Sequence, residues 1–234
     1  MHASKPARRA SPECCSIAHS EVVENYLKAI FALASREDVV TTSALASQLG
    51  VAPPSASAML KRLEVSELIH RSYDFQIQLS EHGRRHALGI VRRHRLLEVF
   101  LVEVLGVPWD EVHAEAEVLE HAVSARLEQR IDALLNHPTH DPHGDPIPPS
   151  SGEHVEDWAN PLATAAAGAR FMVERVSDRD SDVLRHLAGL GVRPGVILYL
   201  IEWAPFGGPL WVELDGRKLA LGSDLVRVIH GRTI

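Results

Sequence analysis

The chain has 234 residues, of which 45% are hydrophobic and 24% are charged, and its formal net charge is −7. These values exclude a wholly disordered chain, and no apolar run approaches the roughly 20 residues that a membrane-spanning helix requires. The charge is uneven, because residues 41–95 contain eight Lys or Arg against four Asp or Glu, whereas residues 96–160 contain two against fourteen. The first segment suits the phosphates of nucleic acid and the second suits cations.

The chain is predicted to begin with a flexible tail, because residues 1–18 show no apolar periodicity. The two cysteines, Cys14 and Cys15, are adjacent in this tail and cannot build a disulfide framework. We therefore expect a reducing, cytoplasmic location.

The next part of the chain predicts a small DNA-binding domain. Apolar residues recur at helical spacing over residues 20–34, a short helix follows over 41–50, and a third helix opens at Pro53. The segment RSYDFQIQLS (71–80) alternates around a turn and predicts a two-stranded hairpin. This order predicts a winged helix-turn-helix over residues 19–83, with the third helix in the DNA major groove. An unrelated small helical bundle is the alternative.

The rest of the chain predicts a helical domain and then a small β domain. A long helix is expected over residues 81–105 and a further helix, broken near Ser124, after it, which gives a helical domain over 84–140. Residues 141–168, rich in Pro, His and Asp, are expected to form a connector. Short strands separated by Gly and Asp-Gly over residues 169–234 predict a β-barrel with one helix near Ser181. The fold class is therefore mainly α with a small β part.

The helical domain contains a cluster of potential metal ligands. These side chains are spaced to share helix faces or lie in the connector, and they are His94, Glu98, His113, Glu117, Glu120, His121, Asp141 and His143. Each pair alone is also common on a solvated helix, but together they could build an octahedral site of nitrogen and oxygen ligands. Such a site without a thiol suits Mn(II) or Fe(II), although Zn(II) and Cu bind more tightly unless geometry excludes them.

The sequence gives little support to an enzyme. It contains no phosphate-binding G-x-x-x-x-G-K loop, no H-E-x-x-H and no G-x-S-x-G motif. We therefore do not expect catalysis. A metal-dependent hydrolase built on the His/Glu cluster is the alternative from this class, and it would need an open coordination position.

Four stretches carry a resemblance to a known family, and they are ENYLKAIFAL (24–33), VRRHRLLEVFL (91–101), VPWDEVHAEAEVLEHAVSARLE (107–128) and DPHGDPIP (141–148). Over residues 19–234 the chain resembles the diphtheria toxin repressor family, and its manganese-responsive branch in particular. The resemblance implies an N-terminal winged helix-turn-helix, a helical metal-binding and dimerisation domain, and a C-terminal SH3-like (FeoA-like) domain. It also implies a homodimer that binds operator DNA when it carries metal and represses metal-uptake genes.

The resemblance further implies two metal sites. The primary site would use Glu117, Glu120 and His121, with Asn25 from the first helix. The second site would draw on the side chains of His94, Glu98 and His113, or of Glu98, Asp141 and His143, in either case with Asp180. Iron-sensing relatives have a thiol at the position of Glu117, so an oxygen ligand there favours Mn(II). Asn25 departs from the family pattern, because a neutral amide leaves the primary site one negative charge short.

In such a repressor, we expect Ser55, Ser57 and Lys61 on the third helix to face double-stranded operator DNA, with Thr42, Ser43 and Arg62 toward its phosphates. Helix capping is the alternative role for the two serines. The function predicted from the sequence is a Mn(II)-dependent repressor that controls metal-ion homeostasis genes, with no organic cofactor. A winged-helix regulator that senses Fe(II) or a small organic ligand is the alternative.

Overall fold

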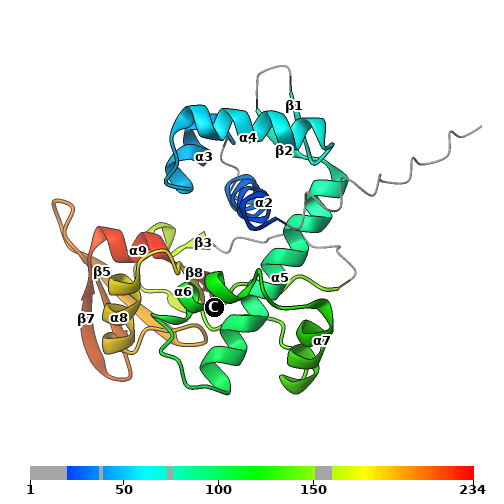
Figure 1. Ribbon diagram of the computed structural model, residues 1–234. Coiled ribbons are helices and arrows are strands. Elements are labelled where there is room, and N and C mark those ends of the chain that lie inside the picture. Colours follow the sequence, from blue (N-terminus) through cyan, green and yellow to red (C-terminus); the bar gives the residue numbers. More distant parts are fainter. Residues whose placement is uncertain (1–19, 37–38, 73–75, 151–159) are drawn as a thin grey trace, which may run out of the picture. The chain divides into compact units, whose positions relative to one another are not determined.

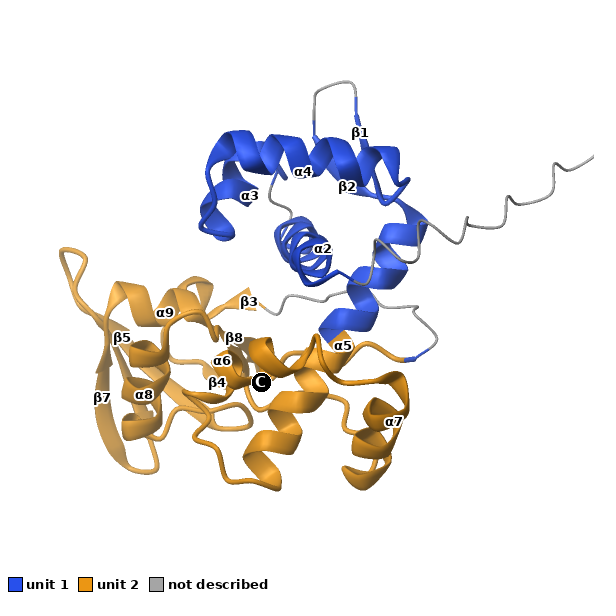
Figure 2. Ribbon diagram, viewed as in Figure 1, with its two compact units in different colours: residues 1–91, 150–154 blue, residues 92–149, 155–234 orange. Residues whose placement is uncertain are grey.

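The computed structural model describes residues 20–36, 39–72, 76–150 and 160–234 (Figure 1). The predicted tail, the turn of the predicted hairpin at residues 73–75 and part of the predicted connector lie outside the described residues. The chain forms two compact units, one of residues 1–91 with 150–154 and one of residues 92–149 with 155–234 (Figure 2).

The first unit is a winged helix-turn-helix. Its elements are α2 (Glu21–Ala34), α3 (Thr42–Gln48), α4 (Pro53–Val65), β1 (Ile69–Arg71), β2 (Ile77–Leu79) and the start of α5 (Glu81–Glu103). The Thr41 hydroxyl accepts a hydrogen bond from the Ala44 amide and so begins α3. Strands β1 and β2 pair antiparallel, with Ile69 opposite Leu79. The core of the unit joins the helices to the hairpin through Leu27, Ile30, Leu45, Leu60, Leu63 and Ile77, and the predicted fold class is confirmed here.

The second unit begins with helices. It contains the rest of α5, then α6 (Val112–Leu119) and α7 (Ala125–Leu134). The predicted break near Ser124 is present, because the Ser124 side chain accepts a hydrogen bond from the Leu127 amide and starts α7 as a new helix. Buried Leu97, Val112 and Ile131 pack these three helices together.

The second unit ends in an antiparallel sheet, which in the described residues has the strand order β3-β8-β4-β5-β6-β7. The elements are β3 (Asn160–Pro161), a 3-10 turn (Leu162–Thr164), β4 (Arg170–Val176), α8 (Ser181–Leu190), β5 (Ile197–Trp203), β6 (Leu210–Leu214), β7 (Arg217–Leu221), α9 (Ser223–Val228) and β8 (Ile229–Thr233). Phe171, Leu184, Leu200 and Ile229 lie in its core. The predicted small β domain and its helix near Ser181 are confirmed, but the expectation of one helix is wrong, because residues Ser223–Val228 form a second one, α9.

The turn over residues 141–147 packs against the end of β4. The Val176 amide donates a hydrogen bond to the His143 carbonyl over 2.8 Å, and Arg175 forms an ion pair with Asp145. Gly144 has a φ of 90°, and a Cβ at this position would collide with the Glu174 carbonyl. Only glycine satisfies both conditions, so this residue lets the turn lie directly on the strand.

Candidate metal centre

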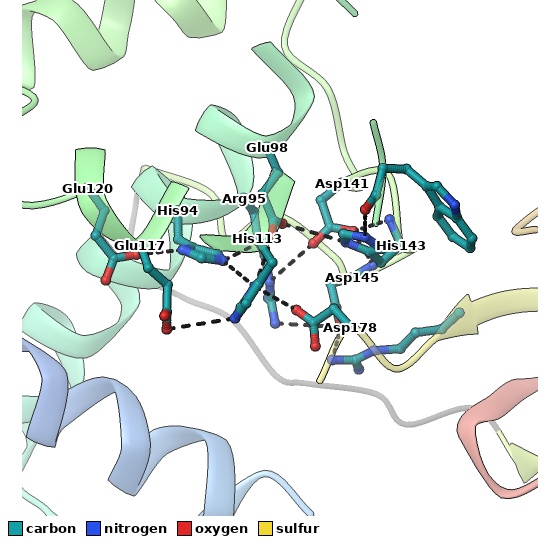
Figure 3. A network of polar contacts seen from close by, with 12 residues as sticks. His94, Arg95, Glu98, His113, Glu117, Glu120, Asp141, His143, Asp145 and Asp178 are labelled. Carbon is teal, nitrogen blue, oxygen red and sulfur yellow. Dashed lines mark hydrogen bonds and ion pairs between the residues drawn. The ribbon is translucent and has the colours of Figure 1, made fainter. Parts of the chain in front are cut away.

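Four side chains from three elements converge in the second unit (Figure 3). His94 and Glu98 lie four residues apart on α5 and therefore share one face of that helix. His113 comes from α6, and Asp178 comes from the loop between β4 and α8. One ligand atom from each of these four residues lies within 4.8 Å of the other three.

The spacing of these ligand atoms fits a metal ion. His94 Nε2 lies 3.0 Å from both Glu98 Oε1 and His113 Nδ1, and His113 Nδ1 lies 3.1 Å from Asp178 Oδ2. Two ligands at right angles, each about 2.1 Å from an ion, are about 3 Å apart. The residues at this centre therefore have both the chemistry and the separations of an N/O metal site.

A second group of ligand atoms shares Glu98 with the first. It consists of Glu98, Asp141 and His143, which are all buried and again lie within 4.8 Å of one another. Within the described residues, one nitrogen or oxygen atom of each side chain is buried without a hydrogen-bond partner: Glu98 Oε2, Asp141 Oδ2 and His143 Nδ1. Burial and the charge of Glu98 raise the pKa of Asp141 well above its usual range.

In the metal-free centre, protons balance the negative charge. Burial favours a protonated Glu98, but the neighbouring imidazoles, His94 foremost, hold its pKa well below its usual range. Burial opposes a charged His113, yet hydrogen bonds to Asp178 and Glu98 raise its pKa to about 11. In the same way, contact with Glu98 outweighs burial and raises the pKa of His143 to about 9. A bound cation would replace these protons, because a ligating histidine must give up its proton.

Comparison with known proteins places this centre in a family. Residues 19–74 match the model of the iron dependent repressor N-terminal DNA binding domain, residues 80–149 match the iron dependent repressor metal binding and dimerisation domain, and residues 160–232 match the FeoA domain. The iron-dependent repressor IdeR of Mycobacterium tuberculosis is 34% identical over 223 residues, which cover 89% of this chain and 96% of IdeR. The chain belongs to the diphtheria toxin repressor family.

Further proteins are similar to this chain over nearly its whole length. The diphtheria toxin repressor of Corynebacterium diphtheriae is 30% identical over 220 residues, which cover 90% of this chain and 96% of that protein. A solved manganese-dependent transcriptional repressor in complex with manganese is 42% identical, with a TM-score of 0.83, and the match covers 90% of this chain and 99% of the other. ScaR with bound Zn²⁺ is 32% identical, with a TM-score of 0.77, over 90% of this chain and 99% of ScaR. The chain is thus a metal-dependent, DNA-binding transcriptional repressor by family, with iron- and manganese-dependent relatives.

Three of the four residues that the family resemblance assigns to the primary site lie near the end of α6. Glu120 is fully buried, its Oε2 lies 2.5 Å from His94 Nδ1, and its Oε1 lies 3.5 Å from His121 Nε2. Glu117 is more exposed, and its Oε1 lies 3.7 Å from His113 Nε2. Asn25 lies on α2 in the first unit, and its role as a ligand stays a prediction.

The structure brings Asp178, and not the predicted Asp180, to the second site. The Asp180 carboxylate accepts hydrogen bonds from the Asp182 and Val183 amides and so caps α8. Sequence reasoning missed Asp178, although one signal could have found it. A helix that begins at Ser181 needs an N-cap at Asp180, which leaves Asp178 as the carboxylate available to the site.

The predicted DNA-contacting residues lie on the two helices of the helix-turn-helix. Thr42 and Ser43 are in the first turn of α3, whereas Ser55, Ser57, Lys61 and Arg62 are on α4. Ser43, Ser55, Lys61 and Arg62 are exposed, and Thr42 and Ser57 are half-buried. The N-cap of α4 is Ala52, without a side-chain hydrogen bond, so capping does not account for the two serines.

One negative finding concerns membranes. None of the helices in the described residues combines the length and apolar character that crossing a bilayer requires.

Proposed function

We propose that this chain is a Mn(II)-activated repressor that binds double-stranded operator DNA as a homodimer in the cytoplasm. It would control genes of metal-ion homeostasis and act by binding alone, without catalysis and without an organic cofactor. The observation that carries the proposal is the group of buried His94 and Glu98 and half-buried His113 and Asp178, which offers two imidazoles and two carboxylates and no thiol. Such a set suits Mn(II) or Fe(II), and the oxygen ligand that Glu117 offers at the primary site favours Mn(II).

The chain's own residues account for how metal could change the protein. When bound, the ion supplies positive charge that compensates the carboxylates of buried Glu98 and half-buried Asp178. Without the ion, the proton on His113 compensates this negative charge, and that proton can be released to solvent. Because α5, α6 and the loop before α8 each supply a ligand, occupancy would hold these elements in one arrangement and reduce the conformational spread of the second unit.

Fe(II) is the second candidate metal. The iron-dependent IdeR proteins are similar over nearly the whole chain, and an N/O site also accepts Fe(II). The ligand set alone does not distinguish Mn(II) from Fe(II), so the effects of the two ions on DNA binding must be compared directly.

The decisive experiment compares metals on one DNA target. Chelator-stripped full-length protein is used to select duplexes from a randomised pool with and without Mn(II), and a recovered palindrome is then titrated with Mn(II), Fe(II), Co(II) and Zn(II). We expect metal to tighten binding at least tenfold, with Mn(II) effective at the lowest free concentration. His113→Ala should lose most of this gain, whereas the exposed His137→Ala on the same unit should keep it. Operator affinity that no metal changes would instead favour a sensor of an organic ligand.

A further inference from the structure

Arg93 of α5 bridges the end of α6 and the start of α7. Its guanidinium donates a hydrogen bond to the Glu120 carbonyl oxygen over 2.8 Å, and its Nε lies 3.3 Å from Glu128 Oε2. Glu120 is the C-cap residue of α6, and Glu128 lies in the first turn of α7. The last carbonyls of a helix need partners from outside it, and a planar guanidinium can serve two acceptors at once. One side chain thus ties the two helix ends together.

The corner that Arg93 spans contains His121, because α6 ends at Leu119 and α7 begins at Ala125. The carbonyl that Arg93 holds belongs to the peptide bond between Glu120 and His121. The atoms of a peptide bond lie in one plane, so a hydrogen bond to this oxygen orients the backbone on both sides of it. Both residues are candidate ligands of the primary site, and one contact from Arg93 therefore acts on two of them.

Two consecutive residues of α5 hold Glu120 from different sides. Arg93 contacts its backbone, whereas His94 Nδ1 lies 2.5 Å from Glu120 Oε2. The Glu120 side chain is fully buried, so it has little freedom to turn away from this contact. Helix α5 thus sets both the backbone and the carboxylate position of this candidate ligand.

The charge of Arg93 is balanced within a small ionic cluster. Glu128 is shared with Arg92, whose Nε lies 3.4 Å from Glu128 Oε1, and Arg92 also pairs with Asp132 over 2.8 Å. The four side chains are only 13–17% exposed, so water and salt screen these ion pairs less than pairs at the surface. Two positive charges face two negative ones, and the cluster holds the Arg93 guanidinium in a fixed position.

We propose that Arg93 is a positioning residue for the primary metal site, which acts through the peptide between Glu120 and His121 and is held in place by Glu128. The inference rests on the proposed function and adds a residue that does not ligate the ion. Arginine stays protonated in proteins and has no lone pair to offer a metal, so its effect on metal binding must be indirect.

The sign of the effect separates positioning from simple electrostatics. A guanidinium bound to the Glu120 backbone places a positive charge close to the proposed cation, and like charges repel. If charge alone mattered, removal of Arg93 would raise the affinity for Mn(II). If Arg93 positions the ligands, its removal lowers that affinity.

The test measures the Mn(II) affinity of full-length, chelator-stripped protein by isothermal titration. Arg93→Met should lower the affinity about tenfold, as is common when a residue that orients metal ligands is removed. Arg92→Met is the matched control. Its guanidinium also pairs with Glu128, but it reaches Asp132 in place of Glu120. The control should keep the wild-type affinity, although both variants should melt at a lower temperature without metal.

Arg93→Lys guards against a loss of folding, because it keeps the positive charge beside Glu128. A single ammonium group replaces the planar fork, so the Mn(II) affinity should again lie below that of the wild type. If Arg93→Met loses its helical circular dichroism, Arg93→Lys alone decides the result. A wild-type or higher affinity in the deciding variant, or equal losses in Arg92→Met and Arg93→Met, would overturn the proposal.

Two variant backgrounds show which metal site Arg93 serves. In His121→Ala, which lacks a candidate ligand of the primary site, Arg93→Met should cause no further loss of affinity. In His113→Ala, which weakens the second site, the loss caused by Arg93→Met should persist. Residues that act through one site give non-additive effects of this kind. Additive losses in the His121→Ala background would show that Arg93 acts elsewhere and would also overturn the proposal.

Operator binding measured on the same samples separates this inference from the proposed function. If Arg93→Met binds Mn(II) more weakly but Mn(II) does not tighten DNA binding by the wild type, the proposed function fails and the positioning role stands. If Mn(II) tightens DNA binding by the wild type and by Arg93→Met at the same free concentration, the positioning role fails alone.

Discussion

At the scale of single residues, the centre contains carboxylates whose negative charge must be balanced whether or not metal is bound. The protons on His113 and His143 do this when metal is absent, since their pKa values rise to about 11 and about 9. Both values lie above the ordinary 6.5 of histidine. The metal-free and metal-bound proteins should therefore respond to pH in opposite directions.

The first prediction concerns this response. A histidine with a raised folded-state pKa stabilises the fold fully below its unfolded pKa, and the contribution is lost as pH rises through the folded pKa. The melting temperature of metal-free protein should therefore fall between pH 7 and pH 10, as measured by calorimetry. His113→Gln, which cannot titrate, should show a shallower fall. Mn(II) affinity should rise over the same range, because fewer protons compete for the ligands. A flat melting temperature for metal-free wild type would contradict the assignment.

The second prediction separates the roles of two aspartates in one loop. Asp178→Ala should lower Mn(II) affinity by at least tenfold, because it removes a candidate ligand, whereas Asp180→Ala should leave that affinity unchanged. Asp180→Ala should instead cost about 1 kcal/mol of unfolding free energy through the lost helix cap, and Asp180→Asn should restore it. Isothermal titration and denaturant unfolding measure the two effects. A loss of metal affinity in Asp180→Asn would return Asp180 to the site.

At the scale of elements, local sequence pattern predicted most of the fold. The apolar spacing of α2 and α5, the two prolines that begin α4 and the Asp-Gly turn at residues 215–216 each depend on neighbours in the sequence, and those elements are present. The grouping of Glu98 with Asp141 and His143, which the structure brings together, was expected from the family resemblance and not from local pattern, because it depends on the docking of residues 141–147 on β4. Asp178 was missed for the same reason, since its place is set by where α8 begins.

The third prediction belongs to α4, the predicted reader of the major groove. Lys61→Ala and Arg62→Ala should each weaken operator binding and reduce the slope of log affinity against log salt by about 0.9, the contribution of one lost phosphate contact. Both side chains are exposed on α4. The control is Arg126→Ala, an exposed arginine on α7, for which the slope should stay at the wild-type value. The measurement is a binding titration repeated from low to moderate salt. If the slopes of Lys61→Ala and Arg62→Ala also stayed at the wild-type value, the two side chains would not contact the DNA.

At the scale of the whole molecule, the C-terminal sheet is part of the metal-binding unit. Trp109, which precedes α6, is buried in the core of the sheet, and its carbonyl and ring hold His143. The guanidinium carbon of Arg193 lies over the Trp109 ring, 4.6 Å from its centroid. The loop that follows β4 therefore supplies one candidate ligand, Asp178, and the core of the sheet holds Trp109 against a second, His143.

The fourth prediction follows from this arrangement. A chain ending at residue 150 should bind Mn(II) more weakly than the full chain and unfold at lower temperature, because Asp178 is gone and Trp109 loses its cover. Trp109 is the single tryptophan in residues 1–150, so its emission should shift to longer wavelength in the shortened chain. The winged helix-turn-helix has its own core and should keep its helical circular dichroism. Unchanged emission and unchanged metal affinity would mean that the sheet is dispensable for the centre.

The position of His94 has a consequence for how sharply a cell could switch its genes. One ring nitrogen contacts Glu120 and the other contacts Glu98 and His113, so a single imidazole touches both proposed sites. An ion that fixes this ring at one site also orients a ligand of the other, and such coupling is reciprocal and typically amounts to about 1–3 kcal/mol. The two sites would then fill at nearly the same metal concentration. Repression would therefore begin over a narrower range of metal concentration than two independent sites allow. The imidazole would make the protein a threshold detector, one that ignores small fluctuations in metal and answers a sustained rise.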